Sequence, residues 1–550
     1  MGTRAEGRVP RHAEATNMPS TLLRGGTVID GSGAAARRAD VLIREDRIVA
    51  IGEVSDADCV LDVGGLIVAP GFIDCHSHSD LYLLEDPFAT PKVAQGVTTE
   101  IVGNCGFGPF PLRNDAARRA MDALVPPTTR PAGKPAEQPD SPREFASLAD
   151  YRAALQRRGT AVNVAALAPH GAIRLSVMGG EDRAATGDEL EQMRGLVREA
   201  MEQGAAGLSF GLLYAPGCFT PMEEMVALGE IVAPFGRPLA FHVRNECDRF
   251  EESVAEAVEI GRQCGAPVHI SHLKVADPAR WGQVGKSLAR IDAARAQGQR
   301  VTCDQYPYTA GSSPFQTLLP PWSLAGGAGE LLKRLRNPAT RQRIAVAMAG
   351  GEEVPGWDNL SLRIGWDRAV VGSAPGEEGY EGKSLAQLAR ETGKLPADLV
   401  CDLLLSTRGA AIGIWHQMCE EDVRTVMPHP AQMVGSDGLP APGKPHPRLW
   451  GTFPRVLGRY VRELGLLTLE QAIHKMTGRP AATFGLAERG LLRAGYYADV
   501  CVFDPARIAD RATWEEPTLP PKGIVHVLCN GLATLQDGLR SEGRPGRYVG

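Results

Sequence analysis

The sequence predicts an α/β protein: a (β/α)8 TIM barrel with a small β-sandwich domain formed from both chain ends and an inserted lid segment. Eight short apolar runs alternate with helical patterns through the middle of the chain, which is typical of βα units. Both ends instead carry short β-rich runs separated by glycine and charged turns. The length of 550 residues accommodates a barrel with appendages, because barrels routinely exceed 250 residues as one unit.

The two chain ends share the pattern of a small antiparallel sheet. Short β-rich runs fill residues 21–63, and the same sequence pattern recurs only at residues 495–504 and 524–531. Each half is too small to bury a core alone, and chain termini often lie close together. We therefore expect residues 18–70 and 489–550 to form one β domain. Residues 1–17 are polar and patternless, and we expect a disordered extension there.

Residues 71–488 are expected to form the barrel. Their runs are apolar on both faces, which favours a closed parallel barrel over an open sheet, although a split arrangement stays open. The clearest helix spans Glu189 to Gln203, where apolar side chains recur on one face and Gly204 supplies a stop signal. The eight runs lie near residues 66, 97, 162, 205, 238, 267, 300 and 432.

Two connections are too long for simple crossovers. Residues 113–143 are rich in proline and charge, and we expect a surface loop with little internal order. Residues 314–424 contain helical patterns and end just before the eighth strand. An insertion on the carboxyl side of a barrel lies over its mouth, so we expect a lid there.

Composition narrows the classes of partner and compartment. The net charge is −6 with no basic cluster, so neither nucleic acid nor an anionic membrane is an expected partner. No long apolar stretch or signal peptide is evident, and the cytoplasm is the expected compartment. The 11 cysteines form no C-x-x-C pair, which favours reduced thiols that are free to bind a metal. The oligomeric state is left open.

A pair of histidines follows the first barrel strand. In an extended strand alternate side chains share a face, so His76 and His78 are expected to point inward together. An isolated H-x-H pair is more often a coincidence than a metal site. Other strand ends change that balance, because they carry Cys105, His242, His272 and Asp437. Imidazole, thiolate and carboxylate together are the ligands that zinc prefers.

Beyond these ligands, longer motifs resemble the amidohydrolase superfamily and, within it, the N-acyl-D-amino-acid deacylases, or D-aminoacylases. The superfamily pattern has H-x-H after strand one, single histidines after strands five and six, and an aspartate after strand eight. Most relatives bridge two metals with a lysine or glutamate, which strand four (AAGLSFGL) lacks, whereas D-aminoacylases use a cysteine in a GNCG turn. The matching segments here are GNCG (103–106), SHLK (271–274), DQYPYTAGSS (304–313) and HPRLWGTFPRVLGRY (446–460).

The resemblance implies a role for each matching residue. It implies one tight zinc site at Cys105, His242 and His272. A second, weaker site would involve His76, His78 and the shared cysteine, with Asp437 completing the superfamily's ligand set. Binding of the substrate carboxylate would fall to Lys274, Tyr306, Ser312 and Arg448.

The expected reaction is zinc-dependent hydrolysis of a small N-acyl-D-amino acid to a carboxylate and a free D-amino acid. Zinc makes water nucleophilic, and Asp437 acts as general base and then general acid. One alternative keeps the metal but changes the substrate to a cyclic amide, as in hydantoinases and dihydropyrimidinases, or to an isoaspartyl dipeptide. A further alternative is an inactive scaffold, which should have lost metal ligands.

Overall fold

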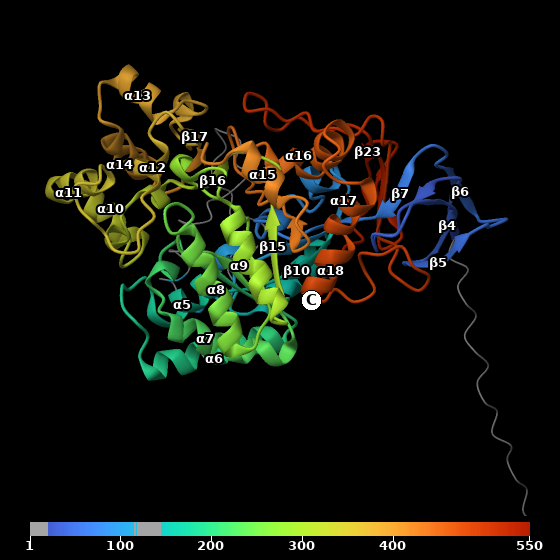
Figure 1. Ribbon diagram of the computed structural model, residues 1–550, viewed down its shortest axis with the longest axis horizontal. Coiled ribbons are helices and arrows are strands. Elements are labelled where there is room, and N and C mark those ends of the chain that lie inside the picture. Colours follow the sequence, from blue (N-terminus) through green and yellow to red (C-terminus); the bar gives the residue numbers. More distant parts are fainter. Residues whose placement is uncertain (1–19, 115–116, 118–144) are drawn as a thin grey trace, which may run out of the picture.

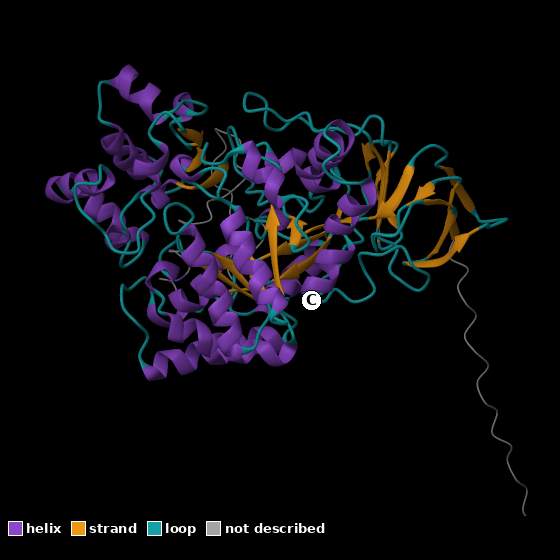
Figure 2. Ribbon diagram, viewed as in Figure 1, coloured by secondary structure: helices purple, strands orange, loops and turns teal. Residues whose placement is uncertain are grey.

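The computed structural model describes residues 20–114, 117 and 145–550. The expected extension over residues 1–17 and nearly all of the expected loop over 113–143 lie outside the described residues. Figure 2 shows strands at the centre of the molecule with helices around them, and a separate group of strands at one end.

The central strands are all parallel and form two sheets. Their orders are β10-β9-β8 and β11-β12-β13-β14-β15-β19. Backbone hydrogen bonds link the two sheets, from Ala206 N to Ala166 O (2.8 Å) and from His78 N to Gly438 O (3.1 Å). The strands are β8 (Phe72–Asp74), β9 (Val97–Val102), β10 (Asn163–Ala166), β11 (Ala168–Pro169), β12 (Leu208–Gly211), β13 (Leu239–His242), β14 (Val268–Ile270), β15 (Val301–Gln305) and β19 (Gln432–Val434).

The first expected barrel run is divided between two sheets. Strand β7 (Ile67–Pro70) pairs with β20 (Val500–Phe503) of the terminal sheet, whereas β8 begins at Phe72 and pairs with β9. Gly71 lies between them, and a Cβ there would lie 2.1 Å from the Thr98 hydroxyl oxygen. The chain therefore changes sheets at a position where only glycine fits.

Helices pack outside the parallel strands. The predicted helix at 189–203 is α6 (Gly187–Glu202), which starts with a capping box between Thr186 and Glu189 and ends before Gly204, whose φ is +95°. The other helices around the strands are α4 (Leu148–Arg158), α5 (His170–Met178), α7 (Met222–Val232), α8 (Phe250–Cys264), α9 (Gly285–Ala296), α17 (Leu469–Met476) and α18 (Gly478–Phe484).

Segments from both chain ends meet in one seven-stranded sheet, ordered β23-β22-β21-β20-β7-β2-β3, at the right of Figure 1. A four-stranded sheet, ordered β5-β4-β1-β6, shares a core with it, in which Leu23 and Val41 join Val500 and Leu528. The strands are β1 (Ser20–Arg24), β2 (Thr27–Val28), β3 (Arg37–Arg38), β4 (Asp40–Arg44), β5 (Arg47–Gly52), β6 (Cys59–Asp62), β20 (Val500–Phe503), β21 (Ile524–Cys529), β22 (Leu532–Gln536) and β23 (Leu539–Arg540).

The last residues of the chain leave these terminal sheets. Gly546 N donates to Thr160 O (2.7 Å) and Val549 N donates to Val164 O (2.8 Å), so the C-terminal residues lie along β10. The sequence expectation had kept everything after residue 489 in the β domain. The difference arises because this short segment uses the unpaired edge of a central strand as its hydrogen-bonding partner.

Most of the segment between β15 and β19 has its own core and lies at the upper left of Figure 1, whereas its last helix, α15 (Glu420–Val426), packs into the main core. A small antiparallel sheet, ordered β16-β18-β17, joins it to the parallel strands. Its main elements are β16 (Gly311–Pro314), α10 (Ala328–Arg336), α11 (Pro338–Met348), α12 (Leu360–Ile364), β17 (Ala369–Ser373), α13 (Leu385–Thr392), α14 (Pro396–Ser406), β18 (Ile412–Trp415) and α15 (Glu420–Val426).

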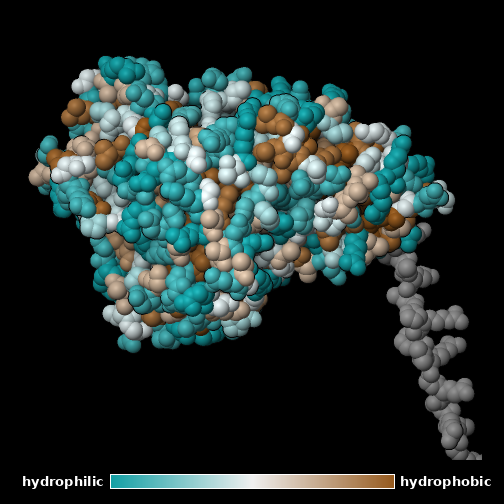
Figure 3. Space-filling view, in the orientation of Figure 1, coloured by the Kyte–Doolittle hydropathy of each residue, from teal (hydrophilic) through white to brown (hydrophobic). Residues whose placement is uncertain are grey.

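The surface in Figure 3 is mostly hydrophilic, with apolar patches interrupted by polar side chains. Among the described residues, no helix combines the length and hydropathy that crossing a membrane requires.

Candidate metal centre and active site

The six residues expected to bind metal all lie at or just beyond the carboxyl ends of parallel strands. His76 and His78 follow β8, Cys105 lies in the turn after β9, and His242 is the last residue of β13. His272 follows β14 and Asp437 follows β19. Because carboxyl ends of parallel strands meet at one edge, residues that are far apart in sequence converge there.

The structure brings these side chains within reach of one another. Cys105 Sγ lies 3.3 Å from His76 Nε2 and 3.4 Å from His272 Nε2. Three groups each have their ligand atoms within 4.8 Å of one another. They are Cys105 with His242 and His272, Cys105 with His76 and His78, and His76 with His272 and Asp437. Cys105 belongs to two of the groups, which is the arrangement expected of a shared ligand.

The backbone is strained at three of these positions. Cys105, His272 and Asp437 have φ values of +54°, +36° and +48°, a region that side-chain-bearing residues rarely adopt. Close packing holds the cysteine turn: a Cβ on Gly103 would lie 2.3 Å from Leu167 O, and one on Gly211 would lie 1.9 Å from Cys105 O. Such strain persists only where the surrounding structure enforces it, and it concentrates at functional sites.

The electrostatics of the group suit a cation. Burial alone would raise the pKa of the Cys105 thiol, but His76 and His272 lower that pKa well below its usual range. The thiolate is the form that binds metal. Burial lowers the pKa of His242, and neither of its buried ring nitrogens has a hydrogen-bond partner among the described residues. An unpartnered neutral imidazole beside a thiolate fits a zinc ion.

Asp437 is placed to remain ionised. Burial would raise its pKa, but Arg448 and His76 lower it well below its usual range. Its Oδ1 lies 3.1 Å from His78 Nε2, and its Oδ2 lies 2.8 Å from Arg448 Nη1. Burial lowers the pKa of His78, yet Asp437 and Cys105 raise it to about 9.

Asp304 is a buried carboxylate that sequence reasoning did not assign. Its Oδ2 lies 3.1 Å from His76 Nδ1 and 2.8 Å from His269 Nε2, and its Oδ1 accepts from His272 N at 3.0 Å. Metal-binding histidines commonly donate their second N–H to such a carboxylate, which sets the tautomer and the ring orientation. The signal available was the DQYPYTAGSS motif, which begins at this residue.

Glu246 and Lys92 are two further buried charges that the sequence did not reveal. Glu246 Oε1 lies 3.2 Å from His272 Nδ1 and 2.5 Å from Lys274 Nζ. Its spacing of four residues from His242 was the available signal. Lys92 Nζ contacts Asp74 Oδ2 at 2.5 Å and Ser436 Oγ at 2.8 Å, so it joins the segments that lead into the H-x-H pair and Asp437.

The expected carboxylate-binding residues divide into two groups. Lys274, Tyr306 and Ser312 line a cavity together with His242 and His272, and the inserted segment supplies part of its wall. The Tyr306 hydroxyl is buried and has no hydrogen-bond partner among the described residues. This cavity therefore offers an ammonium and a free hydroxyl to an anionic ligand.

Arg448 has a different setting from the other three. It is fully buried, its guanidinium stacks 4.4 Å from the centre of the Tyr306 ring, and Nη2 donates to Ser312 O at 3.2 Å. Its Nη1 forms the ion pair with Asp437. Arg448 thus connects the expected base to the cavity wall.

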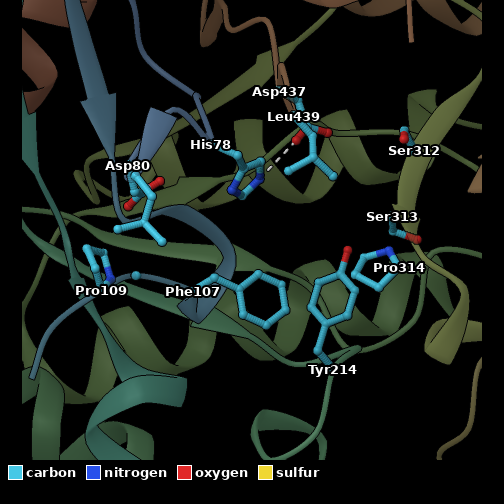
Figure 4. Close-up of a pocket in the computed structure, with 12 residues that line it drawn as sticks. His78, Asp80, Phe107, Pro109, Tyr214, Ser312, Ser313, Pro314, Asp437 and Leu439 are labelled. Carbon is cyan, nitrogen blue, oxygen red and sulfur yellow. Dashed lines mark ion pairs between the residues drawn. The ribbon is translucent and has the colours of Figure 1, made fainter. Parts of the chain in front are cut away.

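A second pocket adjoins Asp437 and His78 (Figure 4). The Phe107 and Tyr214 rings lie side by side on one wall, with their centres 4.7 Å apart. Tyr214 also meets His242 edge-on, with ring centres 4.7 Å apart.

Comparisons with known proteins support this geometry. The sequence pattern described as "Amidohydrolase family" matches residues 60–533. The chain belongs to the amidohydrolase family. This confirms the resemblance predicted from the motifs. The chain is 42% identical over 534 residues to N-acyl-D-glutamate deacylase of Alcaligenes xylosoxydans xylosoxydans, with 96% of each protein covered.

Solved structures of this amidohydrolase group are similar over nearly the whole chain. A structure of D-aminoacylase, described with a binuclear metal center, has a TM-score of 0.80 and 38% identity, covering 96% of this chain and 99% of that one. N-acyl-D-glutamate deacylase from Bordetella bronchiseptica, complexed with zinc and a phosphonate inhibitor that mimics the tetrahedral intermediate, has a TM-score of 0.79 and 37% identity, covering 97% and 99%.

Proposed function

We propose that this amidohydrolase is a zinc-dependent deacylase that hydrolyses N-acyl-D-amino acids to a carboxylate and a free D-amino acid. The observation that carries the proposal is the convergence of Cys105, His242 and His272 within 4.8 Å of one another. They adjoin a cavity that contains Lys274 and the unpartnered Tyr306 hydroxyl. The deacylases similar to this chain, one of them in complex with zinc, support the same reaction.

The metal-binding roles follow from the donor set. Cys105, His242 and His272 would hold one zinc ion tightly, and His76 and His78 would hold a second, weaker ion through the shared cysteine, with Asp437 beside both. When bound, zinc lowers the pKa of a water molecule toward neutrality and polarises the amide carbonyl. Asp304 and Glu246 orient the histidines by accepting from their second ring nitrogens.

The protein's own groups supply binding and proton transfer. Lys274 and Tyr306 bind the substrate carboxylate, and Ser312 completes that wall. The ionised Asp437 takes a proton from the attacking water and delivers it to the departing amine. Arg448 holds the Asp437 carboxylate in place through Oδ2 and leaves Oδ1 facing the histidines.

The arrangement of the domains fits this function. We propose that the parallel strands close into a (β/α)8 barrel, which the bond between His78 and Gly438 and the linked sheet edges support. Residues 18–70 and 489–540 then form a small β-sandwich domain, the last residues of the chain lie along β10, and the insertion at about 314–424 caps the mouth. Cytoplasmic location is consistent with 11 cysteines that are all free thiols.

The test is hydrolysis of a panel of N-acetyl amino acids in both configurations, with a hydantoin and an isoaspartyl dipeptide as the competing substrates. We expect turnover of the D-configured N-acetyl compounds only. Asp437→Asn should keep its zinc and lose at least about 100-fold in kcat, because it removes the group that transfers the proton. Preferred hydrolysis of the hydantoin or the dipeptide, or a near-normal rate for Asp437→Asn, would contradict the proposal.

A further inference from the structure

The pocket in Figure 4 is distinct in chemistry from the cavity that contains Lys274. Its apolar wall consists of side chains from five separate segments. The apolar lining residues are Leu81, Phe107, Pro109, Tyr214, Pro314 and Leu439.

The charged side chains that line this pocket, His78, Asp80 and Asp437, are already engaged. His78 and Asp437 pair with each other at 3.1 Å, and Asp80 Oδ1 accepts from Gly103 N at 2.7 Å. Within the described part of the chain, no lysine or arginine lines the pocket. A charged ligand group would lose its hydration here without gaining a partner, so the pocket favours an apolar group.

The two cavities meet at the proposed reaction centre. Both are lined by Asp437, Tyr214 and Ser312. Figure 4 shows Tyr214 and Ser312 at one side of the apolar pocket, with Pro109 at the other, so this pocket extends away from the wall that the cavities share.

An N-acyl amino acid extends in two directions from its amide bond. If Lys274 and Tyr306 bind the carboxylate on the amine side, the acyl chain on the carbonyl side must leave past Asp437 in another direction. We propose that the pocket walled by Phe107, Tyr214 and Leu439 is the acyl subsite, and that it selects apolar acyl chains longer than acetyl. This inference rests on the proposed deacylase function.

The test varies the acyl chain at a constant amino acid. N-acetyl-, N-butanoyl- and N-hexanoyl-D-alanine are compared, because the small alanine side chain leaves the other contacts constant. Each methylene that enters an apolar pocket is worth about fourfold in binding, so partial burial of two predicts a rise in kcat/KM of about tenfold from acetyl to butanoyl. An equal or lower kcat/KM for butanoyl, with acetyl still hydrolysed, would overturn the inference while the deacylase function stands.

Two variants of one wall residue test the location. Leu439→Asn keeps the side-chain size but adds polarity. It should abolish the butanoyl preference, so that kcat/KM is about the same for the butanoyl and acetyl substrates. Leu439→Trp fills the pocket and should lower kcat/KM for hexanoyl at least tenfold more than for acetyl. Leu324→Asn is the matched control, because Leu324 lines neighbouring clefts and neither of the two cavities described above.

The D-amino-acid side chain is the competing occupant. N-acetyl-D-leucine and N-acetyl-D-alanine are therefore compared in the same variants. If the Leu439 variants change the leucine-to-alanine ratio and leave the acyl series unchanged, the pocket holds the side chain and the inference is wrong. If wild-type protein hydrolyses no N-acyl-D-amino acid, the function and the inference fall together.

Discussion

The contacts of Asp304 predict that its replacement by asparagine disrupts zinc binding without unfolding the protein. The wild-type carboxylate faces His76 Nδ1 and His269 Nε2 through one oxygen and the backbone of His272 through the other. In Asp304→Asn, an amide nitrogen that can only donate faces the two rings. His76 must then accept at Nδ1 and carry its hydrogen on Nε2, the atom that lies 3.3 Å from Cys105 Sγ. A protonated nitrogen cannot bind metal.

The magnitude follows from the number of ligands affected. Removing one partner behind a metal ligand typically costs 10-fold to 100-fold in metal affinity or activity. Asp304→Asn changes the ring partner of one ligand, His76, so we expect a loss within that range, about 10-fold to 100-fold. Asparagine preserves the shape and the hydrogen bond to His272 N, so the loss should appear in the second metal equivalent first.

The assay is zinc content after dialysis against a graded chelator, together with kcat/KM on an N-acetyl-D-amino acid. Asp422→Asn is the matched control, because Asp422 is also buried and accepts two backbone N–H groups, from Gly282 and Val284, but lies outside the candidate site. It should retain its metal and its rate. Wild-type zinc affinity and kcat/KM in folded Asp304→Asn would refute the reasoning.

Two further predictions concern stability and local packing. Burial raises the pKa of Asp358 to about 6, above its unfolded value of 3.8, so the folded state holds the proton more tightly and stability falls as the pH rises from about 4 to 6. Asp358→Asn should remove that slope and gain up to about 3 kcal/mol at pH 8 but little at pH 4, as measured by urea unfolding at both pH values; an equal gain at both would contradict the assignment. Gly211→Ala should lower zinc content and activity at least about tenfold, because its Cβ would meet Cys105 O at 1.9 Å, whereas Gly195→Ala, which has open space on α6, should leave both unchanged. Full zinc in both variants would rule out the packing argument.

Much of the fold and of the candidate site could be predicted from local sequence patterns. The eight apolar runs all contribute parallel strands, and α6 ends just before Gly204, the predicted stop signal. The six expected ligands were identifiable because each follows a strand directly, and parallel strands present their carboxyl ends at one edge. The boundary expected between residues 70 and 71 falls where β7 ends, but the sequence did not predict that the first run supplies a strand to each of two sheets, because the chain remains apolar and extended through both strands.

The sequence by itself determined which side chains reach the active edge, since strand periodicity and strand order are local and topological properties. Only the tertiary structure decided how those side chains are paired. Asp304 meets His76 across 228 residues, and Arg448 turns to Asp437 rather than lining the cavity. The apolar pocket likewise combines segments from residues 81 to 439. Such contacts depend on packing distances between distant segments, and no spacing along the chain encodes them.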